Sequence, residues 1–109
     1  MLRAGGVDAE LDLAALPRLP GTDALLERGL RSSLHAANAA FGIALDGLDP
    51  GDRRAALLFD PQTSGGLLAS VPAEWADECT SALASEGCGA AVIGTFRAAV
   101  PGGRVRVRT

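Results

Sequence analysis

The chain has 109 residues, of which 48% are hydrophobic and 21% charged, a balance typical of one globular domain and not of a disordered segment. The net charge of −3 gives no overall positive field for nucleic acid, and no apolar run approaches the ~18 residues of a membrane span. Every basic residue is arginine, which excludes chemistry that needs a lysine of this chain, such as a Schiff base or a P-loop. The first residues contain no apolar signal region, so we expect a cytoplasmic protein without membrane or nucleic-acid partners.

Alternation of apolar and acidic residues predicts a strand over Val7–Leu13 with one face in water. Thr22 is placed to cap a short helix over 23–28, and Gly29 is placed to end it. Because this helix has few apolar residues, we expect it to need tertiary contacts.

A second helix is predicted from Ser32 or Ser33 to Phe41, with one of the two serines as its cap. A loop over 46–52 follows this helix. The apolar run 55–59 comes next and is typical of a strand buried on both faces.

Residues 67–71 predict another buried strand, and Pro72 starts a helix that runs to Ser85 and stops at Gly87. Apolar side chains recur along this helix at helical spacing, which predicts core packing for Trp75, Cys79, Ala82 and Leu83.

The end of the chain predicts two more strands. The first covers 90–96, where Gly94 indicates a bulge or a close backbone approach. In the second, over 104–108, arginines alternate with valines and should form a solvated face. The order β-α-α-β-β-α-β-β predicts one α+β domain over 1–109, with helices packed on one face of a mixed sheet.

The two cysteines, Cys79 and Cys88, lack CxxC spacing, and one histidine cannot complete a zinc site with them. We expect buried, reduced thiols that act as small apolar side chains. A thiol redox pair is the alternative interpretation.

A polar connection, Asp60–Gly66, joins the two predicted buried strands. Asp60 can cap a turn or face a cation, and the glycines permit positive φ and a close ligand approach. The remaining polar side chains are neutral donors and acceptors: Gln62, Thr63 and Ser64. Composition alone fits both a structural turn and a ligand loop. A Walker loop is excluded, because there is no lysine and a strand is predicted to follow.

Residues 58–68, LFDPQTSGGLL, closely resemble a hallmark of the selenophosphate synthetase (selenide, water dikinase) family. Three further stretches agree with that family in order and spacing: LPRLPG at 16–21, GLRSSLH with Asn38 at 29–38, and AVIG at 91–94. The resemblance covers nearly the whole chain, and its first motif is the specific one. The family is similar to a larger group typified by aminoimidazole ribonucleotide synthetase.

The resemblance implies the C-terminal domain of a two-domain synthetase, with the fold of the aminoimidazole ribonucleotide synthetase C-terminal domain. In such enzymes the N-terminal domain binds ATP and Mg²⁺, and the complete protein converts ATP, selenide and water to selenophosphate, AMP and phosphate. We expect this chain to lack that domain, to be inactive alone, and to bind neither ATP nor Mg²⁺ tightly by itself. The full-length protein is expected to be a homodimer, mainly through the missing domain. Residues 1–4 resemble an internal stretch of the family, so Met1 is expected to be either an internal methionine taken as a start or an artificial boundary of the chain.

The resemblance also places the loop of Asp60, Gln62, Thr63, Ser64, Gly65 and Gly66 beside the active-site cleft, near the phosphates. Asp60 is expected to cap the turn and not to bind metal. Ser33 and Asn38 are candidate cleft residues, with helix capping as the other explanation for Ser33. His35 is expected to be a packing or surface residue, and no catalytic or metal-binding residue is assigned. The alternative function is a free-standing, non-catalytic module of the same fold that binds a partner or an anionic metabolite.

Overall fold

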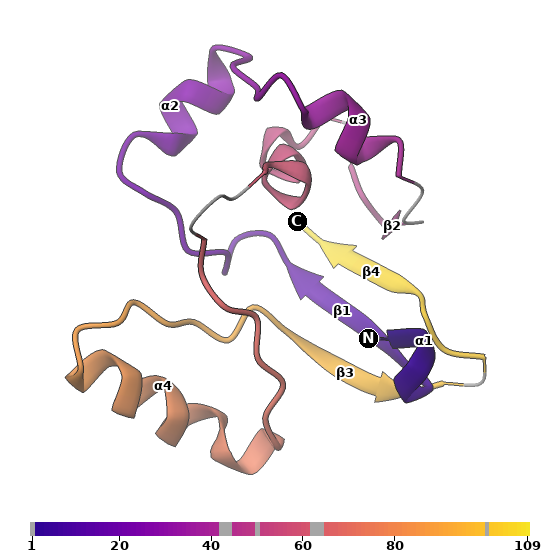
Figure 1. The fold of residues 1–109 in the computed structure, drawn as a ribbon, viewed down its shortest axis with the longest axis vertical. Helices are drawn as coiled ribbons and strands as arrows, with labels where there is room; N and C mark the ends of the chain where they lie inside the picture. Colours follow the sequence, from indigo (N-terminus) through magenta and orange to yellow (C-terminus); the bar gives the residue numbers. More distant parts are fainter. Residues whose placement is uncertain (1, 42–44, 50, 62–64, 100) are drawn as a thin grey trace.

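A four-stranded mixed sheet with the order β2-β4-β1-β3 forms the centre of the fold (Figure 1). The computed structural model describes residues 2–41, 45–49, 51–61, 65–99 and 101–109. The sheet consists of the parallel central pair β1 (Val7–Asp12) and β4 (Val105–Arg108), with β2 (Leu45–Asp46) parallel to β4 and β3 (Gly94–Ala98) antiparallel to β1. The strands predicted near the two ends of the sequence are confirmed, and they pair with each other.

The two faces of the sheet differ in chemistry, as the alternating sequences predict. Val105 and Val107 are buried, and with Leu13 they form the hydrophobic core on one face. On the opposite face the arginines of β4 meet the acids of β1, and Arg108 Nε lies 3.0 Å from Glu10 Oε1. The arginine row is therefore a solvated surface, on which Arg108 is paired with Glu10 and, at 3.9 Å, with Asp12.

The apolar face is covered by α1 (Leu2–Gly5) and by the 3₁₀ helix η1 (Arg53–Phe59). Leu2 from α1 packs against the core, as do Ala55 and Leu58 from η1. The α+β class with a mixed sheet is confirmed.

The strand predicted over 55–59 is wrong, because these residues form η1. Asp52 precedes η1, and its side chain accepts a 2.9 Å hydrogen bond from the backbone N–H of Arg54, which starts the helical turn. A short apolar run specifies burial but fits a buried helix as well as a strand.

Two short helices, α2 (Thr22–Glu27) and α3 (His35–Ala39), contact η1 and not the sheet. Gly29 ends α2 as predicted: it has φ 75°, and its N–H donates to the carbonyl of Leu26. Thr22 does not cap α2. The cap position is Gly21, which has φ 87° and offers no side-chain acceptor.

The helix α3 begins later than predicted. The hydroxyl of Ser32 accepts a 3.2 Å hydrogen bond from the N–H of Leu34, which forms a turn ahead of the helix. His35 is the first helical residue, and its cap position makes no side-chain hydrogen bond.

The predicted helix after Pro72 is confirmed as a 3₁₀ turn, η2 (Ala73–Trp75), followed by α4 (Ala76–Ser85). Its predicted core packing is wrong. The helix α4 lies off the sheet (Figure 1) and contacts no strand, so Trp75 remains 55% exposed. Ala82 and Leu83 are also exposed, and Cys79 is half-buried. Cys88 is exposed, which corrects its predicted burial, and both thiols are free.

The strand predicted over 67–71 is also wrong. These residues have no regular secondary structure, and Leu67 is fully exposed, at 100%. The apolar run indicates burial, but no described strand supplies the backbone hydrogen bonds that a strand needs. The next strand is displaced from its predicted 90–96 to Gly94–Ala98. Its predicted close approach is confirmed, because a Cβ on Gly94 would strike the carbonyl oxygen of Glu10.

Candidate functional site

The predicted ligand loop begins where η1 ends. Asp60 is exposed and follows η1 in extended conformation, and its N–H donates to the carbonyl of Leu57 at 3.4 Å. The predicted positions Gln62, Thr63 and Ser64 lie outside the described residues.

Gly65 and Gly66, at the far end of the loop, are exposed. Gly66 does not adopt positive φ, and a Cβ there would meet no atom within 4 Å. Gly66 therefore shows neither the positive φ nor the close approach of another group that a glycine at this position permits.

Asn38 is the predicted site residue that the fold brings to the root of this loop. Its side-chain Nδ2 donates a 2.9 Å hydrogen bond to the carbonyl oxygen of Phe59, the residue before Asp60. Asn38 is half-buried on α3. Two of the four stretches that carry the family resemblance, 29–38 and 58–68, therefore meet in space.

The ring of His35 packs on the same root. It meets the ring of Phe59 edge-on, with 6.0 Å between centroids and 80° between planes. The histidine is a packing residue, as predicted. Ser33 is exposed and makes no hydrogen bond with any described residue, so the fold does not bring it to the loop root with Asn38.

A solvent-open hollow of ≈ 220 Å³ lies against the loop root. It is lined by residues of α3, η1 and the segments before them, with two guanidinium groups and one imidazole: Arg31, His35, Ala39, Asp52, Arg53, Ala55, Ala56 and Phe59. This composition suits a shallow contact with an anionic group more than enclosure of a small molecule.

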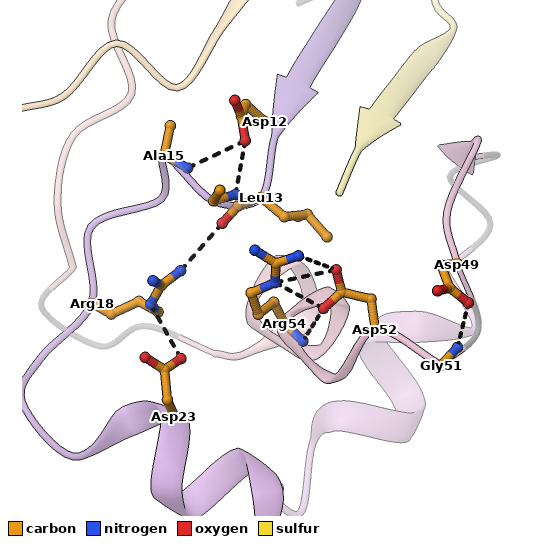
Figure 2. Close-up of polar contacts among 10 residues, drawn as sticks. Asp12, Leu13, Ala15, Arg18, Asp23, Asp49, Gly51, Asp52 and Arg54 are labelled. Carbon is orange, nitrogen blue, oxygen red and sulfur yellow. Dashed lines mark hydrogen bonds and ion pairs between the residues drawn. The ribbon is translucent and has the colours of Figure 1, made fainter.

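Asp52 and Arg54 form the strongest polar contact beside this hollow (Figure 2). Arg54 Nη2 lies 2.6 Å from Asp52 Oδ2, and its Nε donates to Asp52 Oδ1 at 3.0 Å. The Asp52 side chain is 9% exposed. The hydrogen bonds from the guanidinium lower the pKa of the Asp52 carboxyl, because they favour its charged form.

A second hollow, of ≈ 480 Å³, shares Asp52 and Arg53 with the first and extends to α2. Three carboxylates (Asp23, Glu27 and Asp52) and two guanidiniums (Arg53 and Arg54) line it. Arg53 Nη1 donates to the carbonyl of Glu27 at 2.5 Å, and Arg18 Nε lies 3.3 Å from Asp23 Oδ1 (Figure 2). This hollow therefore has little uncompensated positive charge.

Sequence reasoning missed Asp52, Arg53 and Arg54. The available signal was an aspartate directly before the apolar run with an arginine two residues later, which is a helix-start pattern. The continuous apolar run after it favours a strand, so this pattern alone does not predict a helix.

Among the residues that the structure describes, no three His, Cys, Asp or Glu side chains come close enough to hold a metal ion. Within the same residues, no helix has the length and apolar character needed to cross a bilayer.

Two comparisons relate the chain to known proteins. The family described as "AIR synthase related protein, C-terminal domain" matches residues 1–107. "Selenide, water dikinase" of Pseudomonas straminea is 38% identical over 104 residues, which is 93% of this chain and 29% of that protein. The protein of the same name from Nitratidesulfovibrio vulgaris is 38% identical over 105 residues, 94% of this chain and 30% of its own length. That from Escherichia coli (strain K12) is 38% identical over 109 residues, 98% of this chain and 30% of its own length. The chain thus spans under a third of the length of these curated relatives.

Proposed function

Because the chain belongs to the AIR synthase related proteins, through their C-terminal domain, we propose that it is the C-terminal domain of a selenophosphate synthetase. The complete enzyme would convert ATP, selenide and water to selenophosphate, AMP and phosphate in the cytoplasm. This chain would supply one wall of the cleft, and the ATP-binding half would come from an N-terminal domain. Alone, the chain would have no activity.

The observation that carries this proposal is the 38% identity to proteins named "Selenide, water dikinase", which extends over more than nine-tenths of the chain. The hydrogen bond between Asn38 and Phe59 adds support. It ties the helix α3 to the start of the loop that resembles the family hallmark. A loop that presents backbone groups to a ligand must be held in position, and a hydrogen bond to a packed helix does this.

In this proposal the chain positions the phosphates of ATP and supplies no reactive side chain. Asp60–Gly66 would lie along the phosphates of ATP, with backbone N–H groups of the loop as donors. Asn38 would hold the loop root, and η1 would hold Asn38 over the core. No catalytic step is assigned to a side chain of this chain.

The test is a chimera in which this chain replaces the matching C-terminal part of the Escherichia coli enzyme. Selenide-dependent formation of AMP and selenophosphate would be measured, the latter by ³¹P NMR. We expect turnover by the chimera, and none by the 109-residue chain or by the enzyme truncated before the replaced part. A folded chimera that binds ATP but forms no selenophosphate would contradict the proposal.

The alternative is a non-catalytic module that binds an anionic metabolite by itself. The hollow beside Phe59, with Arg31, His35 and Arg53 at its rim, is the feature that favours it. Calorimetric titration of the isolated chain with ATP and with inorganic phosphate distinguishes the two functions. Binding in the micromolar range would favour the module, whereas the synthetase proposal predicts no tight binding to this chain.

A further inference from the structure

The hollow of ≈ 220 Å³ beside the loop root concentrates positive charge. Arg31 lines it from the segment before α3, His35 from α3 and Arg53 from the start of η1. Its one described carboxylate, Asp52, is already neutralised, because Arg54 donates to both of its oxygens. No described carboxylate forms an ion pair with Arg31 or Arg53. The hollow therefore carries two guanidinium charges that no described acid compensates.

Both guanidinium groups are held in position through one nitrogen. Arg31 Nη1 donates to the carbonyl of Leu30 at 2.7 Å. Arg53 Nη1 donates to the carbonyl of Glu27. A backbone carbonyl fixes the place of a guanidinium but leaves its full positive charge, so each side chain is oriented without being neutralised.

The other edge of each guanidinium is available to a ligand. Within the described part of the chain, Nε and Nη2 of Arg31 and of Arg53 donate to no protein atom. These are the same two nitrogens through which Arg54 binds Asp52: Nε donates to Oδ1 and Nη2 to Oδ2. This edge of a guanidinium matches the spacing of two oxygens on one oxyanion.

The imidazole of His35 adds a third polar group to the hollow. Its edge-on contact with the ring of Phe59 fixes its position, and its ring nitrogens make no hydrogen bond with a described residue. The other lining side chains are apolar, and among them Ala56 is only 8% exposed. Charges interact more strongly beside such an apolar surface than they do in open water.

The charge balance of the hollow indicates which anion fits. The larger hollow has more carboxylates than guanidiniums among its lining residues, so it does not favour an anion. In the smaller hollow, a carboxylate ligand would neutralise only one of the two free charges. A tetrahedral dianion neutralises both and offers separate oxygens to donors that come from three segments of the chain.

We propose that this hollow binds a tetrahedral oxyanion of the phosphate type between Arg31 and Arg53, with His35 as the third donor. Among the described elements, α2 and α3 contact η1 alone, so the bound anion would be a second link between these helices and η1. The site does not depend on the proposed function. Because the hollow is open to solvent, we expect a dissociation constant in the millimolar range, which leaves the calorimetric comparison of the two functions unaffected.

Titration of the ¹⁵N-labelled chain with sulfate, followed by NMR at constant ionic strength, tests the proposal. Sulfate has the shape and charge of the expected ligand class. We expect saturable shifts of the Nε–H signals of Arg31 and Arg53. Acetate should bind at least about fivefold more weakly, because it carries one charge. The proposal would be overturned if acetate bound equally well, or if neither arginine signal showed a saturable shift up to about 50 mM sulfate.

Substitutions test which side chains hold the anion. Arg31→Gln and Arg53→Gln should each raise the dissociation constant for sulfate at least roughly fivefold, because each removes a charged donor pair. Arg28→Gln is the matched control: Arg28 is exposed, lines neither hollow, and should change this constant less than about twofold. His35→Phe keeps an aromatic ring beside Phe59 and removes the ring nitrogens, so it should weaken binding about twofold or more. Equal weakening by Arg28→Gln and Arg53→Gln would indicate general surface charge and overturn the site, and an unchanged affinity in His35→Phe would contradict the third donor.

Inorganic phosphate and methyl phosphate identify the form in which the group is bound. Shifts of the same two arginine signals with both compounds would show that the hollow accepts a phosphate ester of a larger ligand. Shifts with inorganic phosphate alone would show a site for the free ion. Binding of sulfate without binding of either phosphate would contradict the assigned ligand class.

Discussion

The side-chain nitrogen of Asn38 donates a 2.9 Å hydrogen bond to the carbonyl oxygen of Phe59, 21 residues further along the chain. This contact joins α3 to the end of η1 at the point where the candidate ligand loop begins. A packed helix thus determines where the loop starts. The contribution of this hydrogen bond to the free energy of unfolding can be measured by substitution of Asn38.

Replacing Asn38 by alanine should lower the free energy of unfolding by about 1–2 kcal/mol, because a half-buried carbonyl loses its donor. Urea unfolding followed by circular dichroism measures this change. Ser33→Ala is the control, since Ser33 is exposed and should change stability by less than about 0.5 kcal/mol. Equal effects of the two substitutions would show that the hydrogen bond does not stabilise the loop root.

Stability should depend on pH through Asp52. Its pKa lies below the ordinary value of 3.8, first because of the hydrogen bonds from Arg54. The unfolded chain therefore takes up this proton before the folded chain does. The contribution of Asp52 is complete above about pH 4 and is lost as the pH falls through the lowered pKa.

Urea midpoints of the parent chain and of Asp52→Asn should differ at pH 7, and the difference should shrink below about pH 4. Asparagine still caps the helix, so the loss at neutral pH should be up to about 1 kcal/mol and should come from the lost charge pairing with Arg54. Asp46→Asn, which alters an exposed carboxyl, serves as the control. If the difference between parent and Asp52→Asn were the same at pH 3 and pH 7, the role assigned to the carboxylate would be incorrect.

Adding a methyl group at Gly94 should disrupt the pairing of β1 with β3. A Cβ there would strike the carbonyl oxygen of Glu10, so the strands must separate. We expect Gly94→Ala to destabilise the chain by about 1–3 kcal/mol and to speed amide exchange along β3. The control is Gly66→Ala, where a Cβ meets no atom within 4 Å and stability should not fall. Unchanged exchange along β3 would contradict the close approach.

Truncating Leu13 should have the largest effect of the four. Its side chain is 0% exposed and belongs to the core with Val105 and Val107. Leu13→Ala should cost about 2–5 kcal/mol, as large-to-small changes in packed cores do. Thermal unfolding of Leu13→Ala and of Leu25→Ala, whose side chain is half-exposed, makes the comparison. A similar melting temperature for both variants would place the core elsewhere.

The strands at the two ends of the sequence could be predicted because apolar and polar residues alternate there. This alternation determines both the extended conformation and which side chains lie on the buried face of the sheet. In Val7–Asp12 and in Val105–Arg108, only a strand puts every apolar residue on one side. The continuous runs 55–59 and 67–71 lack that constraint. They specify burial, and whether the result is a helix, a strand or an exposed arm depends on contacts that are distant in the sequence.

The candidate site could be predicted in part. Asn38 and the loop after Phe59 were identified from motifs, but their hydrogen bond depends on how α3 packs against η1. Asp52 and Arg54 cannot be predicted as site residues, because an aspartate that starts a helical turn is common and carries no signal of function.

Pairing of β1 with β4 also constrains how the protein forms during synthesis. Asp8 and Arg104, which share a 2.9 Å hydrogen bond, are 96 residues apart, and β1 needs β4 on one side and β3 on the other. The first strand therefore stays unpaired on both edges until more than 80 further residues have been synthesised. Such long-range topology slows folding and leaves early segments open to aggregation, so the nascent chain should depend on chaperones that bind β1 until β4 has left the ribosome.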